Sequence, residues 1–414
     1  MRVTRLQPEG PRAGADAGLA LRSLVPGGAS VRADVEAVVD GVRAGGDAAL
    51  ARFVARFDGH EGPLRVPAER LDAAVAQLRG DVRAGIETAM ANVAAVAGAS
   101  LGDDAELVLP QGQRVVVHEV PVGRAAIYAP GGRAPYPSTV VMGVVTARVA
   151  GVADIAVCSP GAHEVVLAAC ALCGVDEVYA MGGAQAVAAF AYGTETIRRA
   201  DVIAGPGGLH VQEAKRLVSG DVGIDGFLGP SDLLVVASGG ADPELIGLDL
   251  LAQAEHGDGT LVGLVTDDLA LADAVCGRLA EGEETGAAAA VVLVGGLEEA
   301  LRVADAFAPE HLALVGEAEP LAAQRIAGCV FVGAAGAVAF GDYVAGSNHS
   351  LPTQGAARFA SALSPRAFRR RMAEVHVGEA AAALARAGVP LARAEGFPRH
   401  AESMEARVRE NGPS

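Results

Sequence analysis

Tryptophan is absent from this chain of 414 residues, and aromatic residues together make up only 4% of it. A hydrophobic core must therefore be built from alanine, valine and leucine, which suits helices packed closely on parallel strands. Charged residues reach only 20% and hydrophobic residues 51%, so the composition excludes an intrinsically disordered chain. The length exceeds one ordinary core, and we expect two or three domains.

Basic charge and long apolar runs are also lacking. The net charge is −17, and the Arg-rich run Arg366–Arg371 is more simply a solvated helix face than a phosphate-binding site. No uninterrupted apolar stretch reaches the roughly 20 residues of a membrane span. The segment Met1–Arg5 is not followed by the apolar region of a signal peptide. We therefore expect an acidic, cytoplasmic enzyme that binds neither nucleic acid nor membranes.

A disulfide framework is not expected. The five cysteines are odd in number and scattered, which indicates reduced thiols in a cytoplasmic protein. Cys170 and Cys173 form a C-x-x-C pair inside an apolar helix pattern. Since no second Cys or His pair accompanies them, we interpret both as small core residues and not as metal ligands.

The first part of the chain is predicted to be mainly helical. Residues 1–20 are predicted to form a polar, Gly-rich arm. Apolar residues then recur at three- and four-residue spacing, which predicts helices over Val31–Phe57, Ala68–Leu78 and Val82–Val96. The Val-rich segment Arg114–Glu119 is predicted to be a strand.

From Arg124 onwards the pattern alternates between strand and helix. The predicted strands are Arg124–Tyr128, Asp154–Cys158, Glu177–Ala180 and Asp201–Ala204. The helices that follow them are Thr139–Ala150, with Ser138 as its cap, His163–Cys173, Ala184–Tyr192 and Leu209–Val218. This alternation predicts a doubly wound parallel sheet, which binds its ligands where turns leave the carboxyl ends of the strands.

Three Gly-rich turns join these strands to their helices, at Ala129–Gly132, Gly182–Gly183 and Gly205–Gly208. None matches G-x-G-x-x-G, so the standard dinucleotide fingerprint is absent. Each turn alone could be a glycine that the backbone needs. Three such turns in one block favour a cofactor or another phosphate-bearing ligand.

A second alternating block and a helical tail complete the chain. The block has predicted strands at Leu233–Ala237, Leu261–Thr266, Ala290–Val294, His311–Val315 and Val330–Val332, with helices at Pro243–His256, Leu269–Leu279, Leu297–Phe307 and Pro320–Ile326. After Ser364, helices are predicted at Pro365–Ala373, Gly378–Ala387 and Ala401–Arg409. Since this tail lacks a core of its own, we expect it to dock on another domain or subunit.

These patterns define the expected architecture. The fold class is α/β, with two doubly wound, Rossmann-like domains, a helical N-terminal region and a helical C-terminal tail. Residues 21–123 together with 235–364 are expected to form a discontinuous first α/β domain. Residues 124–234 are expected to be an inserted domain that binds the cofactor, and residues 365–414 form the tail.

Polar residues that could carry chemistry stand out in the second block. Gln253 and His256 are three residues apart at the end of a predicted helix, so they would share one face as half of a metal site or simply as a polar helix end. Glu310 and His311 are adjacent at a strand start. Further candidates are Asp342 and His349, which flank a Gly-rich loop, and His400, which precedes the last helix. Glutamine, histidine and aspartate together would suit zinc, but spacing alone does not show that they converge.

The sequence resembles the histidinol dehydrogenase family over nearly its whole length. The matching stretches follow one another in the family's order from Tyr128 to Thr353. They are Tyr128–Ser138, Gly182–Ala186, Ala214–Val218, Gly229–Ser231, Gln253–His256, Ala308–Leu312, Gly341–Tyr343 and Asn348–Thr353. So many motifs in the right order are far more specific than any one of them.

The resemblance implies a zinc-containing homodimer that uses two NAD to oxidise L-histidinol to L-histidine by way of the aldehyde. The zinc ligands implied are Gln253, His256, Asp342 and His400, and the acid/base pair implied is Glu310 and His311. The residues implied to contact the substrate are these four ligands, His311, Ser231, His349 and Glu395, with Glu395 and His400 supplied by the swapped tail of the partner subunit. Tyr128, Gln185 and the turn at Gly208 would contact NAD.

These residue types fit that chemistry. A hydride leaves an alcohol carbon only as the hydroxyl proton is removed, and His311 is a suitable base. Zinc can fix and polarise an amino alcohol. The second oxidation needs water added to the aldehyde, and the carboxylate of Glu310 could activate that water.

Several positions depart from the family pattern, mostly on the cofactor side. Gly208 and Gly143 stand where the family usually has Asn, Thr146 stands for Pro, and Asp232 stands for Glu. Two alternatives therefore accompany histidinol oxidation: a paralogue that oxidises a different small alcohol, or a non-catalytic ligand-binding relative. The intact acid/base and metal positions argue against the non-catalytic reading, because a sensor has no use for an acid/base pair.

Overall fold

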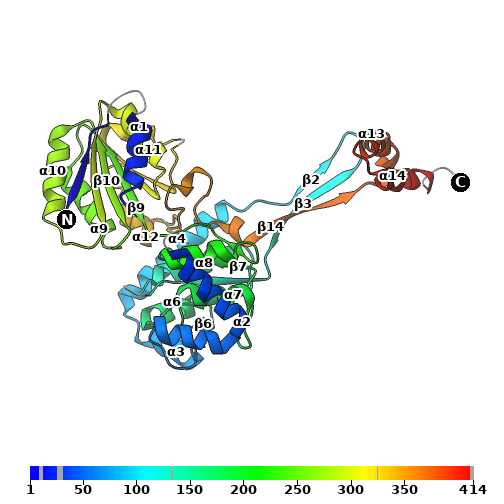
Figure 1. The fold of residues 1–414 in the computed structure, drawn as a ribbon, viewed down its shortest axis with the longest axis horizontal. Coiled ribbons are helices and arrows are strands. Elements are labelled where there is room, and N and C mark those ends of the chain that lie inside the picture. The colour runs from blue at the N-terminus through cyan, green and yellow to red at the C-terminus, as the bar shows by residue number, and fades with distance from the viewer. Residues whose placement is uncertain (9–12, 26–30, 132–133, 324, 411–414) are drawn as a thin grey trace. The chain divides into compact units, whose positions relative to one another are not determined.

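The computed structural model describes residues 1–8, 13–25, 31–131, 134–323 and 325–410. The chain divides into two compact units: a larger one of Met1–Ser100 and Val122–Phe368, and a smaller one of Leu101–Pro121 and Arg369–Ser414. The larger unit holds a six-stranded and a five-stranded parallel sheet (Figure 1). No helix in the described parts of the chain combines the length and the hydropathy that crossing a bilayer requires.

The six-stranded sheet, here the first sheet, is parallel throughout and has the order β1-β11-β10-β9-β12-β13. Its strands are β1 (Val3–Leu6), β9 (Asp232–Ala237), β10 (Leu261–Thr266), β11 (Ala288–Leu293), β12 (His311–Val315) and β13 (Cys329–Val332). Helices α9 (Pro243–Ala254) and α10 (Leu269–Ala280) cover one face, and α1 (Ala13–Arg22) and α11 (Leu297–Phe307) cover the other (Figure 1).

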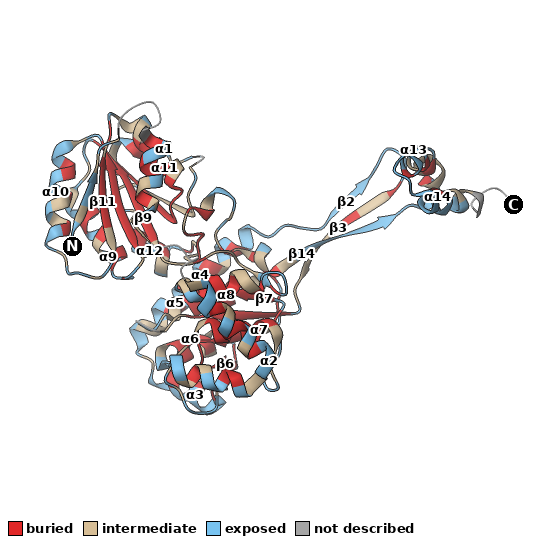
Figure 2. Cartoon of the chain, in the orientation of Figure 1, coloured by how far each residue is buried: buried red, intermediate tan, exposed pale blue. Residues whose placement is uncertain are grey.

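Burial on both faces explains why these strands read as unbroken apolar runs. Every residue of β9 and β10 is buried (Figure 2). Alternate residues serve opposite cores: Leu233 and Val235 pack with α9 and α10, whereas Leu234 and Val236 pack with α1 and α11. A sheet covered by helices on both faces selects such Val- and Leu-rich strands.

The five-stranded sheet, here the second sheet, is also parallel and has the order β6-β5-β4-β7-β8. Its strands are β4 (Arg124–Tyr128), β5 (Asp154–Cys158), β6 (Glu177–Tyr179), β7 (Val202–Ala204) and β8 (Gly223–Ile224). Helices α5 (Pro137–Val149) and α6 (Glu164–Leu172) lie on one face, and α7 (Gly183–Tyr192) and α8 (Leu209–Val218) on the other. The predicted fold class, with two doubly wound α/β sheets, is confirmed. Cys170 and Cys173 lie in the hydrophobic core, as predicted.

The N-terminal helices belong with the second sheet, which differs from the predicted domain division. Helix α2 (Arg32–Phe57) packs on α7 and α8, α3 (Ala68–Gln77) on α6, and α4 (Gly80–Ala99) on α5. Residues 21–123 had been grouped with 235–364 because chain order alone does not show which core an apolar helix face completes. The apolar face of α2 completes the core around Ala126 and Tyr128.

The described residues of the predicted N-terminal arm, 1–8 and 13–20, belong to the first sheet and its helices. Strand β1 pairs in parallel with β11, and Ala17 and Leu21 of α1 are buried against α11. The prediction was wrong because β1 is a short edge strand with polar residues, which becomes recognisable only beside β11. Residues 9–12 lie outside the described part of the chain.

The smaller unit contains an antiparallel sheet and two helices. The sheet has the order β14-β3-β2, with β14 (Arg369–His376), β3 (Arg114–Pro121) and β2 (Ala105–Val108). Helices α13 (Ala381–Ala394) and α14 (Pro398–Glu410) pack through a small core of Ala385, Val389, Ala392 and Ala401. The tail is therefore helical in its last part, as predicted.

Three local predictions were wrong. The segment expected to be a helix at Pro365–Ala373 is a 3-10 turn followed by β14, which pairs with β3 over its whole length. The pairing residues lie some 250 positions away, outside any local pattern, and carry cross-strand ion pairs such as Arg371–Glu119. In place of the expected helix Pro320–Ile326 there is a 3-10 helix at Gly316–Leu321. Helix α5 begins with Pro137 in its first turn and Tyr136 as its cap, so Ser138 is not the cap.

A buried ion pair at the amino ends of β4 and β6 predicts how stability depends on pH. Arg124 and Tyr179 donate to the Glu177 carboxylate. Burial alone would raise the pKa of Glu177, but these hydrogen bonds hold it at about 2 against an ordinary 4.5. A lowered carboxyl pKa stabilises the fold above the ordinary pKa, and this stabilisation is lost as the pH falls through the folded value.

Glu177→Gln is therefore expected to lower stability at pH 7 by about 2–3 kcal/mol, because Arg124 loses its buried charge partner. The difference in melting temperature from the unaltered protein should shrink as the pH falls from 4.5 towards 2, as circular dichroism would show. The matched control is Glu164→Gln, which removes an exposed ion pair with Arg70 and should change little. A difference that stayed constant down to pH 2 would contradict this reading.

Candidate active site

Pairing within the first sheet gathers the candidate acid/base residues at the amino ends of three neighbouring strands. Strand β12 lies between β9 and β13, with His311 opposite Leu233 and Cys329. Ser231 precedes β9 directly, and Glu310 precedes β12. Residues that are some 80 positions apart in sequence therefore meet at one edge of the sheet.

Glu310 is buried and anchored through one of its two carboxylate oxygens. Its Oε2 accepts hydrogen bonds from the Ser231 hydroxyl and from the backbone N–H of Asp232, the latter at 3.0 Å. Within the described residues Oε1 has no hydrogen-bond partner. One oxygen therefore fixes the side chain, and the other is available to a substrate or a water molecule.

His311 is buried between two carboxylates. Its Nδ1 lies 3.5 Å from Glu310 Oε2, and its Nε2 lies 3.6 Å from Asp342 Oδ1. Burial lowers the pKa of His311, but the charges and hydrogen bonds of Glu310 and Asp342 outweigh it and raise the pKa well above its ordinary value. Burial would raise the pKa of Asp342, yet His311 holds it below its ordinary value. The three side chains form one charge-coupled cluster.

The spacing predicts that Gln253 and His256 share one helix face, but His256 lies beyond the end of the helix. Helix α9 ends at Ala254, and Gly257, with φ of +86°, follows the closing turn. Gln253 is buried and donates from Nε2 to the hydroxyl of Ser231, whereas His256 is exposed in the turn. The His256 N–H still bonds to the Gln253 carbonyl at 3.2 Å, and the His256 charge lowers the pKa of Asp342. The two residues remain beside the cluster.

His349 is held by hydrogen bonds at both ring nitrogens. Nδ1 lies 2.9 Å from the backbone oxygen of Asp342, which can only accept, so Nδ1 carries the proton. Burial lowers the pKa of His349, and the neutral ring accepts from the Thr139 hydroxyl at Nε2, at 3.1 Å. His349 therefore joins helix α12 (Val338–Tyr343), which carries Asp342, to α5, and its contact with substrate stays a prediction.

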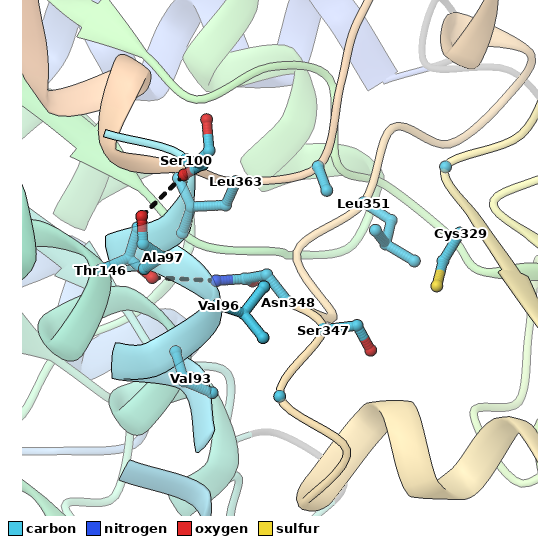
Figure 3. A pocket seen from close by; sticks show the side chains of 14 residues that line it. Val93, Val96, Ala97, Ser100, Thr146, Cys329, Ser347, Asn348, Leu351 and Leu363 are labelled. Carbon is cyan, nitrogen blue, oxygen red and sulfur yellow. Dashed lines mark hydrogen bonds between the residues drawn. The ribbon is translucent and has the colours of Figure 1, made fainter. Parts of the chain in front are cut away.

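Figure 3 shows a cavity of about 230 Å³ in the larger unit. Its lining is mostly apolar and comes from α4, α5, the start of β13 and the loop around Asn348; it includes Val93, Val96, Ala97, Thr146, Cys329 and Leu363. Asn348 donates to Thr146 Oγ1 at 3.1 Å (Figure 3). It also donates to the Met142 oxygen at 3.2 Å, and the two bonds fix the loop on α5. Cys329 stands opposite His311 in the sheet pairing, so the cavity lies next to the acid/base residues.

The Gly-rich turns lie at the carboxyl ends of the second sheet. Tyr128 ends β4, and its hydroxyl accepts from the Gly183 N–H at 3.0 Å. Gln185 is buried, and its Nε2 donates to Asp58 at 3.1 Å. Strands β4 and β7 are the neighbours at which the strand order reverses, and a doubly wound sheet binds its ligand at that point.

Gly205 and Gly208, both in the third turn, differ in whether a side chain would fit at their position. Gly205 has φ of +126°, and a Cβ there would collide with the Tyr128 backbone. Its carbonyl accepts from buried Lys215 at 3.0 Å, and its N–H donates to Asp225, the ion-pair partner of Lys215, at 2.7 Å. Gly208 is exposed, with φ of −63° and open space around it, so a side chain would fit there. Gly132, the last residue of the first turn, and Arg133 after it lie outside the described residues.

Helix termini give the amino ends of the first sheet and the carboxyl ends of the second sheet opposite electrostatic character. In the first sheet, the C-termini of α9 and α11 lie at the amino ends of the strands, next to Gln253 and Glu310. A helix C-terminus carries partial negative charge and favours cations. In the second sheet, the N-termini of α5, α7 and α8 follow the Gly-rich turns and favour anions such as phosphates.

Two predicted site residues belong to the smaller unit. Glu395 follows α13 and His400 lies in α14, and both are exposed. Among the described residues no three His, Cys, Asp or Glu side chains gather closely enough to hold a metal. The larger unit supplies two such residues from the predicted ligand set, His256 and Asp342, together with the Gln253 amide. The sequence predicts no role for Arg22 or Asp232. Arg22 bonds to Asp232, and Asp232 bonds to Glu310.

Comparison with known proteins gives consistent matches. The histidinol dehydrogenase family model matches residues 27–408. A histidinol dehydrogenase of Gluconobacter oxydans is 42% identical over 403 residues, which cover 92% of this chain and 94% of the relative. A histidinol dehydrogenase of Halobacterium salinarum is 42% identical over 397 residues, 91% of this chain and 93% of the relative. The crystal structure of histidinol dehydrogenase from Elizabethkingia anophelis superposes with a TM-score of 0.90 at 27% identity, covering 99% of this chain and 98% of that one.

Proposed function

The chain belongs to the histidinol dehydrogenase family, and we propose that it oxidises L-histidinol to L-histidine through the aldehyde, with NAD as oxidant and zinc at the site. The observation that carries the proposal is the contact of buried Glu310 and His311, at the amino end of β12, with the partly buried carboxylate of Asp342. An acid/base pair beside a free carboxylate oxygen suits an alcohol oxidation followed by a hydration. The step belongs to histidine biosynthesis.

The donor atoms at this edge fit a zinc ion. Gln253 donates through Nε2 to Ser231, which leaves Oε1, the atom that would bind a metal, without a partner among the described residues. The His256 ring likewise makes no hydrogen bond within them. These two residues and Asp342 would hold zinc together with His400 of a second copy. When bound, zinc supplies a positive charge that orients the amino alcohol and polarises its hydroxyl group.

His311 acts as the proton acceptor in the first oxidation. The alcohol carbon loses a hydride to NAD⁺ as the hydroxyl proton moves to His311, which leaves the aldehyde and NADH. In the cluster as it stands, two carboxylates favour protonated His311. A cation held by Asp342 would share the charge of that carboxylate, which would weaken its hold on the His311 proton.

Glu310 acts in the second oxidation. As the oxygen of a water molecule adds to the aldehyde carbon, a water proton moves to Glu310 Oε1. The aldehyde oxygen takes the proton that His311 accepted in the first oxidation, so the hydrate forms and His311 is again a base. The hydrate carbon then loses a hydride to a second NAD⁺ and a hydroxyl proton to the base, which yields the acid. Ser231 and the Asp232 N–H hold Oε2 and so keep Oε1 free for this water.

We assign NAD to the Gly-rich turns of residues 124–234. The N-termini of α5, α7 and α8 would face the pyrophosphate, with Tyr128, Gln185 and the backbone at Gly208 as neighbours. Tyr128 and Gln185 already bond to the α7 N-terminus and to Asp58, so they shape the turn as much as they contact a ligand.

The smaller unit is proposed to complete the site of a second copy in a homodimer, through Glu395 and His400. Its helices bury only a small core and leave large apolar side chains exposed: Leu391 is 63% exposed and Phe397 is 52% exposed. A surface of this kind favours contact with another protein surface.

A direct assay tests the function. The purified protein with L-histidinol and NAD should form two NADH per histidinol consumed, followed by NADH absorbance. Dialysis against a chelator should lower the rate at least about 100-fold, because the proposed reaction needs the bound zinc that the chelator removes. Added zinc should restore the rate. Turnover of other amino alcohols but not of histidinol would favour the paralogue. Tight binding of histidinol without NADH formation would favour the non-catalytic relative.

A further inference from the structure

Asp232 holds Glu310 by two reciprocal hydrogen bonds. The Asp232 N–H donates to Glu310 Oε2 at 3.0 Å, and the Glu310 N–H donates to Asp232 Oδ1 at 2.6 Å. Both residues are buried, at 1% and 6% exposure. The side chain and the backbone of Glu310 are therefore both fixed by a single residue at the start of β9.

Two carboxylates this close inside a protein repel one another unless a cation lies beside them. Arg22, at the end of α1, supplies that cation, since its Nη1 donates to Asp232 Oδ2 at 2.6 Å. Its Nη2 donates to the Phe307 carbonyl at 2.9 Å, and the guanidinium lies 3.7 Å from the centre of the Phe307 ring. Phe307 ends α11, three residues before Glu310, so Arg22 fixes the segment that leads into Glu310.

On the basis of the proposed function, we propose that Arg22 and Asp232 are positioning residues for Glu310. Neither needs to touch substrate. Together they turn Oε2 of Glu310 inward and leave Oε1 to take the proton from the water that adds to the aldehyde. The pair therefore matters most for the conversion of aldehyde to acid, because that step depends on where Oε1 lies.

Two substitutions of Asp232 distinguish the positioning of Glu310 from general structural support. Asp232 has the same volume as asparagine, so Asp232→Asn keeps the packing but removes the charge that pairs with Arg22. Asp232→Glu keeps the charge. A buried arginine–carboxylate pair is directional, and small displacements of a catalytic group reduce rates strongly.

The test measures both oxidations separately, with histidinol and then with the aldehyde supplied directly. Asp232→Asn should lower kcat for aldehyde oxidation about 10–100-fold. Aldehyde formation and the KM values for histidinol and NAD should change by less than about 3-fold, and Asp232→Glu should recover most of the loss. The matched control is Arg302→Gln, which removes an exposed arginine of α11 that pairs with Glu298 and should leave both rates unchanged.

The outcomes are decisive. If the unaltered protein oxidises histidinol but Asp232→Asn slows both steps equally, or neither, the positioning role is wrong while the proposed function stands. If the unaltered protein does not oxidise histidinol, the proposed function fails first. Should Asp232→Asn fail to fold, Arg22→Gln is the second variant, since Arg22 is partly exposed, and the same selective loss is expected. A crystal structure of either variant with Glu310 unmoved would also overturn the proposal.

Discussion

Replacing His311 with asparagine is expected to slow histidinol oxidation about 10²–10⁴-fold, the usual contribution of a positioned base. Asparagine keeps a polar side chain beside the Asp232 carbonyl, which lies 3.3 Å from Nδ1 in the present arrangement. It cannot take the hydroxyl proton, so the hydride has no favourable route to NAD. Single-turnover formation of the first NADH measures this step alone.

Glu310→Gln should slow aldehyde oxidation and aldehyde formation to different extents. Glutamine can still accept from Ser231 and the Asp232 N–H through its amide oxygen, so the packing of the cluster is kept. It cannot take a proton from water, and aldehyde oxidation should therefore fall far more than aldehyde formation. Equal losses in both steps would mean that Glu310 and His311 act as one unit.

A suitable control for both variants is His163→Asn. His163 is exposed and precedes α6, where asparagine is a favourable cap, so neither activity nor stability should fall. A large loss of activity in this control would show that the assay responds to general damage. The effects of His311→Asn and Glu310→Gln could then not be assigned to the first and the second oxidation separately.

Activity should return when two inactive chains are combined, and this is the second large effect. His311→Asn disables the larger unit, and His400→Ala disables the tail that is proposed to serve the other copy. In a homodimer that shares its sites, a hybrid has one site with both defects and one site intact. Hybrids isolated through two different tags should therefore show about half the activity of the unaltered dimer.

The sharpest control combines two tail variants, His400→Ala and Glu395→Ala. If each site takes both residues from one partner tail, every site of this hybrid carries one defect, and activity should stay absent. Metal analysis gives an independent measure, because His400→Ala should lower zinc content and Glu395→Ala should lower it much less. Failure of the first hybrid to recover would place each site within a single chain.

Much of the fold was predictable because the strands are apolar on both faces. Arg124–Tyr128, Leu261–Thr266 and His311–Val315 have the predicted bounds, since both faces of a doubly wound sheet are covered and turns mark each end. Strand β14 was not predictable, because its stability comes from β3, far away in sequence. The packing of α2 to α4 on the second sheet was missed for the same reason.

The candidate site residues also differ in whether the sequence could predict them. Adjacent residues such as Glu310 and His311 could be proposed from the sequence, and the resemblance supplied their roles. Arg22 could not, because it sits 210 residues from Asp232 and in a segment with no chemical signature. The helix end at Ala254 was placed two residues too late, since the apolar rhythm continues into a turn closed by Gly257.

The acid/base residues lie at the amino ends of the first sheet, whereas sheets of this class usually bind ligands at the carboxyl ends. The turn that follows β9 therefore lies a full strand away from Asp232, roughly 20 Å at about 3.3 Å per residue. Gly239 and Gly240 in that turn are exposed, and Gly240 has open space around it. A fluorescent label, an affinity tag or a whole folded domain could be inserted there as an engineered handle that leaves the chemistry intact.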